Sequence, residues 1–455
     1  MKKVFGIVFL VPTIVLLLVA CSETKSLKIW VGVESQEFYA EKAQEYIAMY
    51  KEETGENFPV KIEVLAVDTG TAGGVFLNDT TTAGDIITVA HDNLGRLIAG
   101  SSAIAPIQTQ SLIDQINADN HQVFIDATKG TVQGEEYYFG VPYIGQSLVL
   151  YYDKSKISDA QVESWEGILE AASVAEKQAL SITGTDGFNN SFLLLAVDEE
   201  TKSSSLEIYK DGMFENNYAT GADVLSFIKY GQKTLFGSTY GAKRPSDSGW
   251  QTELQQGHSL SVIGGAWHFN AAYAALGDNL GISLLPTFTL EASDVYNASE
   301  NQELIGKTYR SGTFADVKMF VKNKISKYAE LLDDILAYFS SKEVQEQSFI
   351  AANNLPSYKN ASTEFESLAN PNPQTPEEEL ALELALTQIQ MFEYGMPQPF
   401  GQHVNFNFYY YSKGGPDRIM DILDQSRNTG TFATDAELFA EMKRIENIWK
   451  TGNAE

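Results

Sequence analysis

The chain is predicted to adopt an α/β fold built as two domains. Short segments rich in valine and isoleucine alternate with longer segments in which apolar residues recur at helical spacing, which is typical of strands connected by helices. At 455 residues the chain is longer than one hydrophobic core usually organises, and 44% hydrophobic residues are enough for two cores. With Cys21 as its one cysteine, it must be stabilised by packing and not by an internal disulfide.

The first twenty residues have the order of a secretory signal peptide. Lys2 and Lys3 precede an apolar run, residues 4–20, and Cys21 follows it directly. The ending Leu-Val-Ala-Cys resembles the lipobox of bacterial lipoproteins, in which the cysteine sulfur takes a diacylglycerol. We therefore expect residues 1–20 to be a signal peptide, Cys21 the lipidation site and residues 21–26 a lipid-anchored linker. The alternative is an uncleaved membrane anchor, because the run approaches the lower length limit for spanning.

After this leader, strands and helices are expected to alternate along the chain. Residues 27–33 read as a first strand and residues 37–53 as a helix, followed by strands at residues 60–67 and 85–90. Their high content of valine and isoleucine suits parallel strands that are buried on both faces.

The second half continues the pattern and then becomes mostly helical. We expect strands at residues 147–152 and 259–264, and helices at residues 163–180, 328–340 and 343–352. Pro376, followed by three glutamates, is a helix start signal, because proline fits the first helical position and acids favour the first turn. This predicts a helix over residues 376–391.

The acidic composition makes nucleic acid an unexpected partner. The formal net charge is −28, and no basic stripe with interleaved aromatic residues opposes the repulsion from phosphate. The acidity fits a soluble surface on which neighbouring copies repel one another.

Catalytic and metal-binding motifs are absent from the sequence. The five histidines are scattered, without an HExxH pair, so no metal site or cofactor is expected. An SxxK pattern begins at Ser226 and a KTG pattern at Lys450, but the KTG lies at the chain end and no SDN accompanies them. With 60 acidic residues the chain has enough carboxylates for a glycosidase pair, yet no pattern locates one. We expect a protein that is not an enzyme.

Aromatic residues beside glycines and amides favour carbohydrate binding. Three such clusters, at residues 187–190, 265–270 and 405–411, lie far apart in the sequence. A neutral sugar has apolar faces and a rim of hydroxyls, so it suits flat aromatic rings flanked by Asp, Asn and Gln. Core packing is the alternative explanation of each cluster taken alone.

Several segments carry a more specific signal. The two most specific are GDIITVAHDN at residues 84–93 and GGAW at residues 264–267, and the others are LKIW at 27–30, VPY at 141–143, LVLYYDK at 148–154, GDNLGISLLPT at 277–287 and NLPS at 354–357. Together they resemble the family 1 extracellular solute-binding proteins of ABC sugar importers, in particular the maltose and maltodextrin-binding proteins. The first segment is similar to that family's GPDIIxxAHD, and the second to its GPW turn.

The resemblance implies a two-lobed, periplasmic-binding-protein-like fold of type II with three crossings between the lobes. The N-terminal lobe would comprise residues 27–145 and 288–353, and the C-terminal lobe residues 146–287 and 354–455. A lipid-anchored monomer on the outer face of the cytoplasmic membrane would capture an oligosaccharide between the lobes, close around it, and deliver it to the ABC permease.

The same resemblance assigns binding residues. Asp92 and Glu34 would bind sugar hydroxyls, Trp267 would stack on the sugar, and Phe188 would form an aromatic platform with Asp186 before it as an acceptor. Phe408 and Tyr409 fall in the late aromatic stretch. Structural alternatives are that Trp267 fills the core between the lobes, that Asp92 caps the helix after it, and that Glu34 and Asp186 are solvated acids.

Four positions depart from the maltose-binding pattern. Val89 stands where tryptophan is frequent, Asn93 where arginine, Gln146 where glutamate and Ser35 where lysine. Amides still satisfy hydroxyls, so Asn93 and Gln146 remain candidate contacts and a maltodextrin remains the favoured sugar, with another gluco- or galacto-oligosaccharide as the alternative. A surface adhesion lipoprotein without transport and a secreted glycan-degrading enzyme are the alternative function classes.

Overall fold

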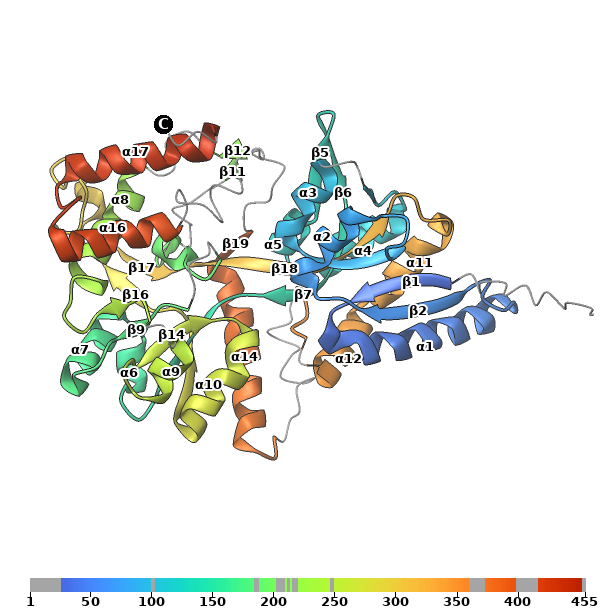
Figure 1. Cartoon of the computed structure of the whole chain (residues 1–455), viewed down its shortest axis with the longest axis horizontal. Coiled ribbons are helices and arrows are strands. Elements are labelled where there is room, and N and C mark those ends of the chain that lie inside the picture. The colour runs from blue at the N-terminus through green and yellow to red at the C-terminus, as the bar shows by residue number, and fades with distance from the viewer. Residues whose placement is uncertain are drawn as a thin grey trace, which may run out of the picture.

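The computed structural model divides into two lobes joined by a narrow waist (Figure 1). It describes residues 26–99, 103–183, 188–201, 209–210, 213–214, 220–245, 249–352, 354–359, 373–397 and 416–451. Within these ranges, no helix combines the length and the apolar character that a membrane crossing requires.

The N-terminal lobe is organised by a sheet whose first three strands are parallel. β1 (Ser26–Val31) lies between β2 (Lys61–Ala66) and β3 (Ile86–Ala90), in the order β2-β1-β3-β18. Leu27, Ile29 and Val31 alternate as buried residues along β1, as expected for a strand that faces a helical layer. The three predicted strands are confirmed, with ends that differ by at most two residues.

Helices cover both faces of this sheet. The predicted first helix is confirmed as α1 (Gln36–Thr54), which contacts α11 (Ala329–Phe339) and α12 (Lys342–Ala352). α1 and α12 lie below the sheet in Figure 1. The remaining elements of this lobe are α2 (Thr69–Asn78), α3 (Leu94–Ala99), β4 (Ile104–Ala105), α4 (Gln110–Asp119), α5 (Gln122–Ala127), β5 (Lys129–Val132) and β6 (Glu135–Tyr138).

The C-terminal lobe has a five-stranded sheet in the order β13-β9-β14-β8-β15 and a three-stranded sheet in the order β10-β17-β16. The strands are β8 (Val149–Asp153), β9 (Leu180–Ser181), β10 (Ala196–Asp198), β13 (Ala242–Lys243), β14 (Ser261–Gly264), β15 (Leu280–Ser283), β16 (Thr287–Thr289) and β17 (Thr308–Ser311). A hairpin of β11 (Tyr209–Lys210) and β12 (Met213–Phe214) accompanies them. The helices are α6 (Asp159–Val162), α7 (Trp165–Ala175), α8 (Ala222–Tyr230), α9 (Gly249–Gln255), α10 (Phe269–Leu276), α16 (Pro416–Thr429) and α17 (Asp435–Thr451).

One predicted helix of this lobe is shorter in the structure. α7 ends at Ala175, where Glu176 adopts a left-handed backbone conformation with φ of 52°, and residue 180 already lies in β9. The chain turns there because Ser181 pairs with Val262 of β14, a contact distant in sequence.

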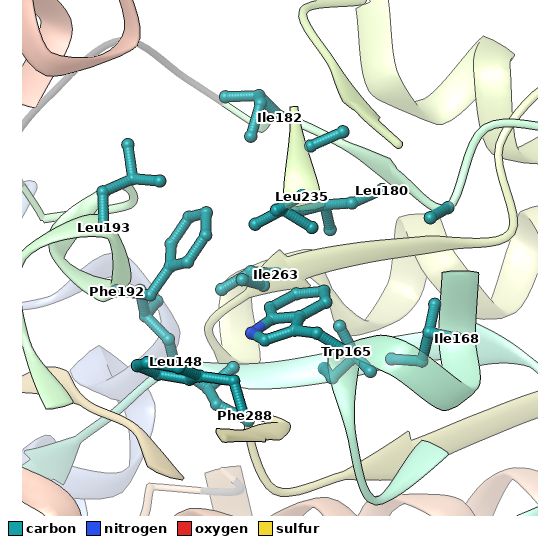
Figure 2. Packing of buried hydrophobic residues seen from close by; sticks show 14 of the residues in the cluster. Leu148, Trp165, Ile168, Leu180, Ile182, Phe192, Leu193, Leu235, Ile263 and Phe288 are labelled. Carbon is teal, nitrogen blue, oxygen red and sulfur yellow. The ribbon is translucent and has the colours of Figure 1, made fainter. Parts of the chain in front are cut away.

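The core of the C-terminal lobe is built around Trp165 at the start of α7. Figure 2 shows its indole among Leu148, Ile168, Ile263 and Phe288. The ring nitrogen donates a hydrogen bond of 2.9 Å to the Ser311 hydroxyl, so its one polar group is satisfied inside the core.

Within the described ranges, two antiparallel strands and one helix connect the lobes. β7 (Gly140–Gln146) pairs with β18 (Thr313–Asn323) from Asp316 to Val321. α14 (Pro376–Met391), confirmed with its predicted bounds, contributes Leu380 and Leu384 to the C-terminal core and Ala385 and Ile389 to the N-terminal core. β19 (Gly395–Pro397) then pairs with the first residues of β18.

The membership of the two cores differs from the proposed lobe boundaries at two places. Phe288, Leu304 and Tyr309 pack in the C-terminal core, although they follow the proposed boundary at residue 288. Leu355 and Tyr358 pack in the N-terminal core, although they follow the proposed boundary at residue 353. Such membership depends on long-range packing, which local patterns do not carry.

Candidate functional site

The N-terminal lobe presents polar side chains at one edge of its sheet. Because β1, β2 and β3 are parallel, their carboxyl ends meet at the same edge. Glu34 follows β1 in a 3-10 turn (Val33–Ser35), and Asp68 follows β2. The Asp68 carboxylate caps α2, since its Oδ1 accepts hydrogen bonds of 3.0 Å from both the amide and the hydroxyl of Thr71.

The C-terminal lobe presents an aromatic surface at the corresponding edge of its own sheet. Trp267 lies in a 3-10 turn (Ala266–His268) directly after β14, and its side chain is 48% exposed. The indole folds back over Gly265, where a Cβ atom would come within 2.3 Å of the ring. Phe188 packs beside it, with ring centroids 5.8 Å apart and an angle of 43° between the ring planes.

A cleft of about 480 Å³ lies between these two edges. Residues from both lobes line it together with residues of the connecting strands and α14. They are Glu34, Asp68, Thr69, Ile144, Gly145, Gln146, Ala266, Trp267, Phe269, Asn270, Lys318, Phe349, Asn354, Leu355, Ala381, Leu384, Ala385 and Gln388. The cleft therefore combines one exposed indole, three charged groups, several amides and an apolar floor.

Two of the charged groups of the cleft, Glu34 and Lys318, form an ion pair within the N-terminal lobe. The Lys318 ammonium, on β18, donates a hydrogen bond of 2.8 Å to Oε1 of Glu34. Partial burial would raise the pKa of the Glu34 carboxyl, but the neighbouring Lys318 charge and its hydrogen bond outweigh it and lower that pKa below its usual value of 4.5. Glu34 is thus held as a carboxylate.

Two buried amides of the cleft hold its wall in place. The Gln388 amide, on α14, donates a 2.8 Å hydrogen bond to the Ser147 carbonyl, and the Ser147 hydroxyl donates to the Gln388 carbonyl at 3.0 Å. Asn354 donates 2.9 Å and 2.8 Å hydrogen bonds to the hydroxyls of Ser35 and Ser348. Since Ser35 follows Glu34 in the chain, Asn354 anchors the turn that carries the carboxylate.

A family model described as "Bacterial extracellular solute-binding protein" matches residues 45–375 of this sequence. The chain belongs to this family. A curated relative, the maltodextrin-binding protein MdxE of Bacillus subtilis (strain 168), is 24% identical over 445 residues and covers 92% of each chain. The resemblance found in the sequence is therefore confirmed.

Solved structures share the fold of this solute-binding protein. The maltodextrin binding protein MalE1 from L. casei BL23, without ligand, matches with a TM-score of 0.69 and 18% identity, covering 94% of this chain and 100% of the other. The maltose-binding protein MalE from Listeria monocytogenes, in complex with maltose, matches with a TM-score of 0.66 and 18% identity, covering 94% and 99%. These matches confirm the predicted two-lobed α/β fold.

Three of the sequence-predicted site residues line the cleft of this solute-binding protein, and Phe188 contacts one of them. Glu34 comes from the N-terminal lobe, Gln146 ends β7 opposite Asp316 of β18, and Trp267 comes from the C-terminal lobe. The structural alternative for Trp267, a plug in the core, does not fit a side chain that is half exposed at the cleft.

Asp92 and Asn93 lie on a 3-10 turn (His91–Asn93) after β3 and are not among the residues that line the cleft. Asn93 is 1% exposed; its amide donates a 2.7 Å hydrogen bond to Asp92 and its oxygen accepts one from Arg96. The Asn93 side chain is therefore held in the interior of the N-terminal lobe. Asp186, Phe408, Tyr409 and Cys21 lie outside the described residues.

The sequence did not single out Lys318, Asp68 or Gln388 as site residues. Lys318 lies in a strand and Gln388 in a helix, and the residues around them match no ligand-binding motif. Asp68 precedes a helix, where an aspartate is expected as a cap whether or not it binds a ligand. Asn270 was inside the aromatic and amide cluster at residues 265–270, which was the signal that located Trp267.

The cleft offers groups that bind a polar organic molecule. Across the part of the chain that the structure describes, no three His, Cys, Asp or Glu side chains gather closely enough to hold a metal ion. The lining supplies a stacking ring, carboxylate acceptors, an ammonium donor and amides that donate and accept, which together suit an uncharged, hydroxyl-rich ligand.

Proposed function

We propose that this protein is the lipid-anchored substrate-binding component of an ABC importer, which captures a maltodextrin-like oligosaccharide between its lobes and delivers it to the permease without making or breaking bonds. The observation that carries the proposal is the convergence of the exposed Trp267 indole from one lobe with Glu34 and Lys318 from the other on a single cleft.

The chemistry of that cleft favours a saccharide. The apolar C–H face of a pyranose stacks on an indole, while its hydroxyls need both donors and acceptors at the rim. Asn270 lies three residues after Trp267 and also lines the cleft, so an amide is available beside the stacking face.

The choice of a maltodextrin rests on the relatives. The curated relative is named for maltodextrin, and a further solved structure of this fold is a cyclo/maltodextrin-binding protein in complex with maltotetraose, with a TM-score of 0.64 and 19% identity. A maltodextrin presents the stacking faces and hydroxyl rims described above, so the lining of this cleft supports the same ligand class.

Ligand-driven closure is the proposed mechanism. A sugar that contacts Trp267 and Glu34 at once binds the closed arrangement better than the open one, and only such a difference in affinity shifts the equilibrium. β7 and β18, the paired strands of the waist, are the proposed hinge. Closure is also the step that would bring Asp92, Phe188, Gln146 and Asn93 toward the sugar, as the family resemblance implies.

Location at the outer face of the cytoplasmic membrane is part of the proposal. The family description calls its members extracellular, and Cys21 after the apolar leader supports attachment by a diacylglycerol. Asp186, Phe408 and Tyr409 remain proposed sugar contacts on the resemblance alone, and a monomer is proposed as the working form.

The decisive experiment titrates the protein, expressed from residue 22, with neutral oligosaccharides in a calorimeter. Maltotriose, maltotetraose, cellotetraose and a galacto-oligosaccharide form the panel, and we expect the two maltodextrins to bind most tightly. Small-angle scattering should show a smaller radius of gyration with maltotetraose, and the recovered sugar should be intact. Absence of saccharide binding would refute the transport proposal, whereas shortened oligosaccharides in the recovered sample would favour the enzyme alternative.

The anchor is tested separately by expressing the full chain and Cys21→Ala in a bacterial host. We expect the full chain to fractionate with membranes and to incorporate labelled fatty acid, and the variant to do neither. Equal labelling of the two proteins would rule out Cys21 as the lipidation site.

A further inference from the structure

Lys318 is the cation of the cleft. It lies in the middle of β18, in register with Ala90 of β3 on one side and Ile144 of β7 on the other. Its side chain is only 15% exposed, yet it lines the cleft. Among the described residues of that lining, it is the one lysine or arginine, and two acids, Glu34 and Asp68, line the same cleft.

The ion pair with Glu34 is held in a fixed geometry. The Glu34 carboxylate folds back against Gly32, where a Cβ atom would come within 2.6 Å of Oε1, so a side chain at that position would displace it. Lys318 reaches Oε1 at 2.8 Å, while the Glu34 side chain remains 47% exposed. The pair is therefore anchored on its inner side and open toward the cleft.

An anchored pair of this kind presents a donor next to an acceptor. An ammonium has three N–H donors, of which Glu34 takes one, and a carboxylate has a second oxygen that accepts. Neighbouring hydroxyls of a pyranose match this arrangement, because one hydroxyl donates to the carboxylate while the other accepts from the ammonium. Hydrogen bonds of this charged type are roughly twice as strong as neutral ones.

We propose that Lys318, acting with Glu34, is a specificity-determining contact that binds two neighbouring hydroxyls of a neutral saccharide and makes the cleft reject acidic saccharides. The rejection follows from the charge balance: the ammonium is already neutralised by Glu34, and Asp68 leaves the described lining with one excess negative charge. This inference rests on the proposed function, because it concerns the same cleft.

The test compares Lys318→Met and Glu34→Gln with the wild type by calorimetry. The probes are maltotriose and maltotriose whose C6 alcohols have been oxidised to carboxylates, which places an anion on every ring. Lys318→Met keeps the aliphatic stem and removes the donors, so we expect its affinity for maltotriose to fall at least tenfold. Glu34→Gln leaves the ammonium without its carboxylate, so we expect the preference for neutral over oxidised maltotriose to shrink at least tenfold.

Lys322→Met is the matched control. Lys322 lies on the same strand, forms a 2.5 Å ion pair with Asp333, is similarly buried, and does not line the cleft. We expect it to lower thermal stability while leaving the affinity for maltotriose within twofold of wild type. Lys318→Gln, which keeps an N–H donor without the charge, gives a second measurement if Lys318→Met does not fold, and we expect an intermediate loss.

The outcomes separate this inference from the proposed function. If the wild type binds maltotriose and both Lys318 variants, folded, bind it within twofold of wild type, the inference is overturned and the transport proposal stands. If the wild type binds no neutral oligosaccharide, the proposed function fails and the inference fails with it. A loss that Lys322→Met shares equally would also overturn the inference, since it would reflect damage to β18.

Discussion

Replacing Trp267 with alanine would remove the aromatic face that the C-terminal lobe presents to the cleft. A tryptophan buries at most about 250 Å² when fully enclosed, and Trp267 is 48% exposed, so about 120 Å² remains available to a ligand. Covering all of it would contribute about 3 kcal/mol at ~25 cal/mol per Å². A sugar that covers one face would gain about half of that, so we expect affinity for maltotetraose to fall by a factor of about 10 to 150.

The assay is calorimetric titration of wild type and Trp267→Ala with maltotetraose, accompanied by thermal unfolding of both proteins without ligand. The unfolding midpoint should change little, because substitution of an exposed side chain costs within about 0.5 kcal/mol. Phe439→Ala is the matched control, since Phe439 is 39% exposed on α17 and stacks on Tyr296 away from the cleft. Equal affinity of Trp267→Ala and wild type, with both proteins folded, would refute our placement of the binding surface.

Three further predictions follow from the geometry. Gly265→Ala would place a methyl group within 2.3 Å of the Trp267 ring and so displace the ring. We expect severalfold weaker sugar binding and an altered tryptophan fluorescence spectrum. An unchanged spectrum would count against the close approach of the Trp267 ring to Gly265. Trp165→Ala should lower the free energy of unfolding by about 3 to 5 kcal/mol through lost packing and the orphaned Ser311 hydroxyl, measured by denaturant titration; a loss below about 1 kcal/mol would contradict the core assignment. The pKa of Glu34 is lowered in the folded protein, so the ionised carboxylate stabilises the fold at pH values above its ordinary pKa of 4.5, and this stabilisation disappears as the pH falls through the lower folded pKa. The difference in free energy of unfolding between wild type and Glu34→Gln should therefore narrow on acidification. A difference that does not change with pH would disprove the link between the Glu34 charge and stability.

Local sequence patterns were sufficient to predict the helices and strands whose ends are decided by their own residues. The helix at Pro376–Met391 has the bounds that its proline and glutamates predicted, because helix capping is decided within one turn. The strand Ile86–Ala90 was likewise visible as an apolar run with β-branched residues. The helix expected to reach residue 180 ends at Ala175 instead, since pairing of Ser181 with Val262 outweighs helix propensity there.

The cleft residues that were predicted came from two signals. Trp267 stands in a cluster of glycines, rings and amides, whereas Glu34 and Gln146 were assigned only by the family resemblance. Lys318 was not found, because a lysine in a strand reads as a solvent-facing residue until its neighbours are known. Its cleft position depends on pairing with β3 and β7, which lie more than 170 residues earlier in the chain.

The sequence by itself determined the α/β class, the two-domain organisation and the family, and it marked the aromatic and amide cluster at residues 265–270, part of which lines the cleft. These features depend on residue type and on short local patterns. Only the tertiary structure decided where the chain changes lobes, which polar groups meet at the cleft and which of them, such as Asn93, face the interior. The physical reason is distance along the chain: Glu34 and Lys318 are 284 residues apart, and their contact exists because sheet pairing and packing of two cores bring them together.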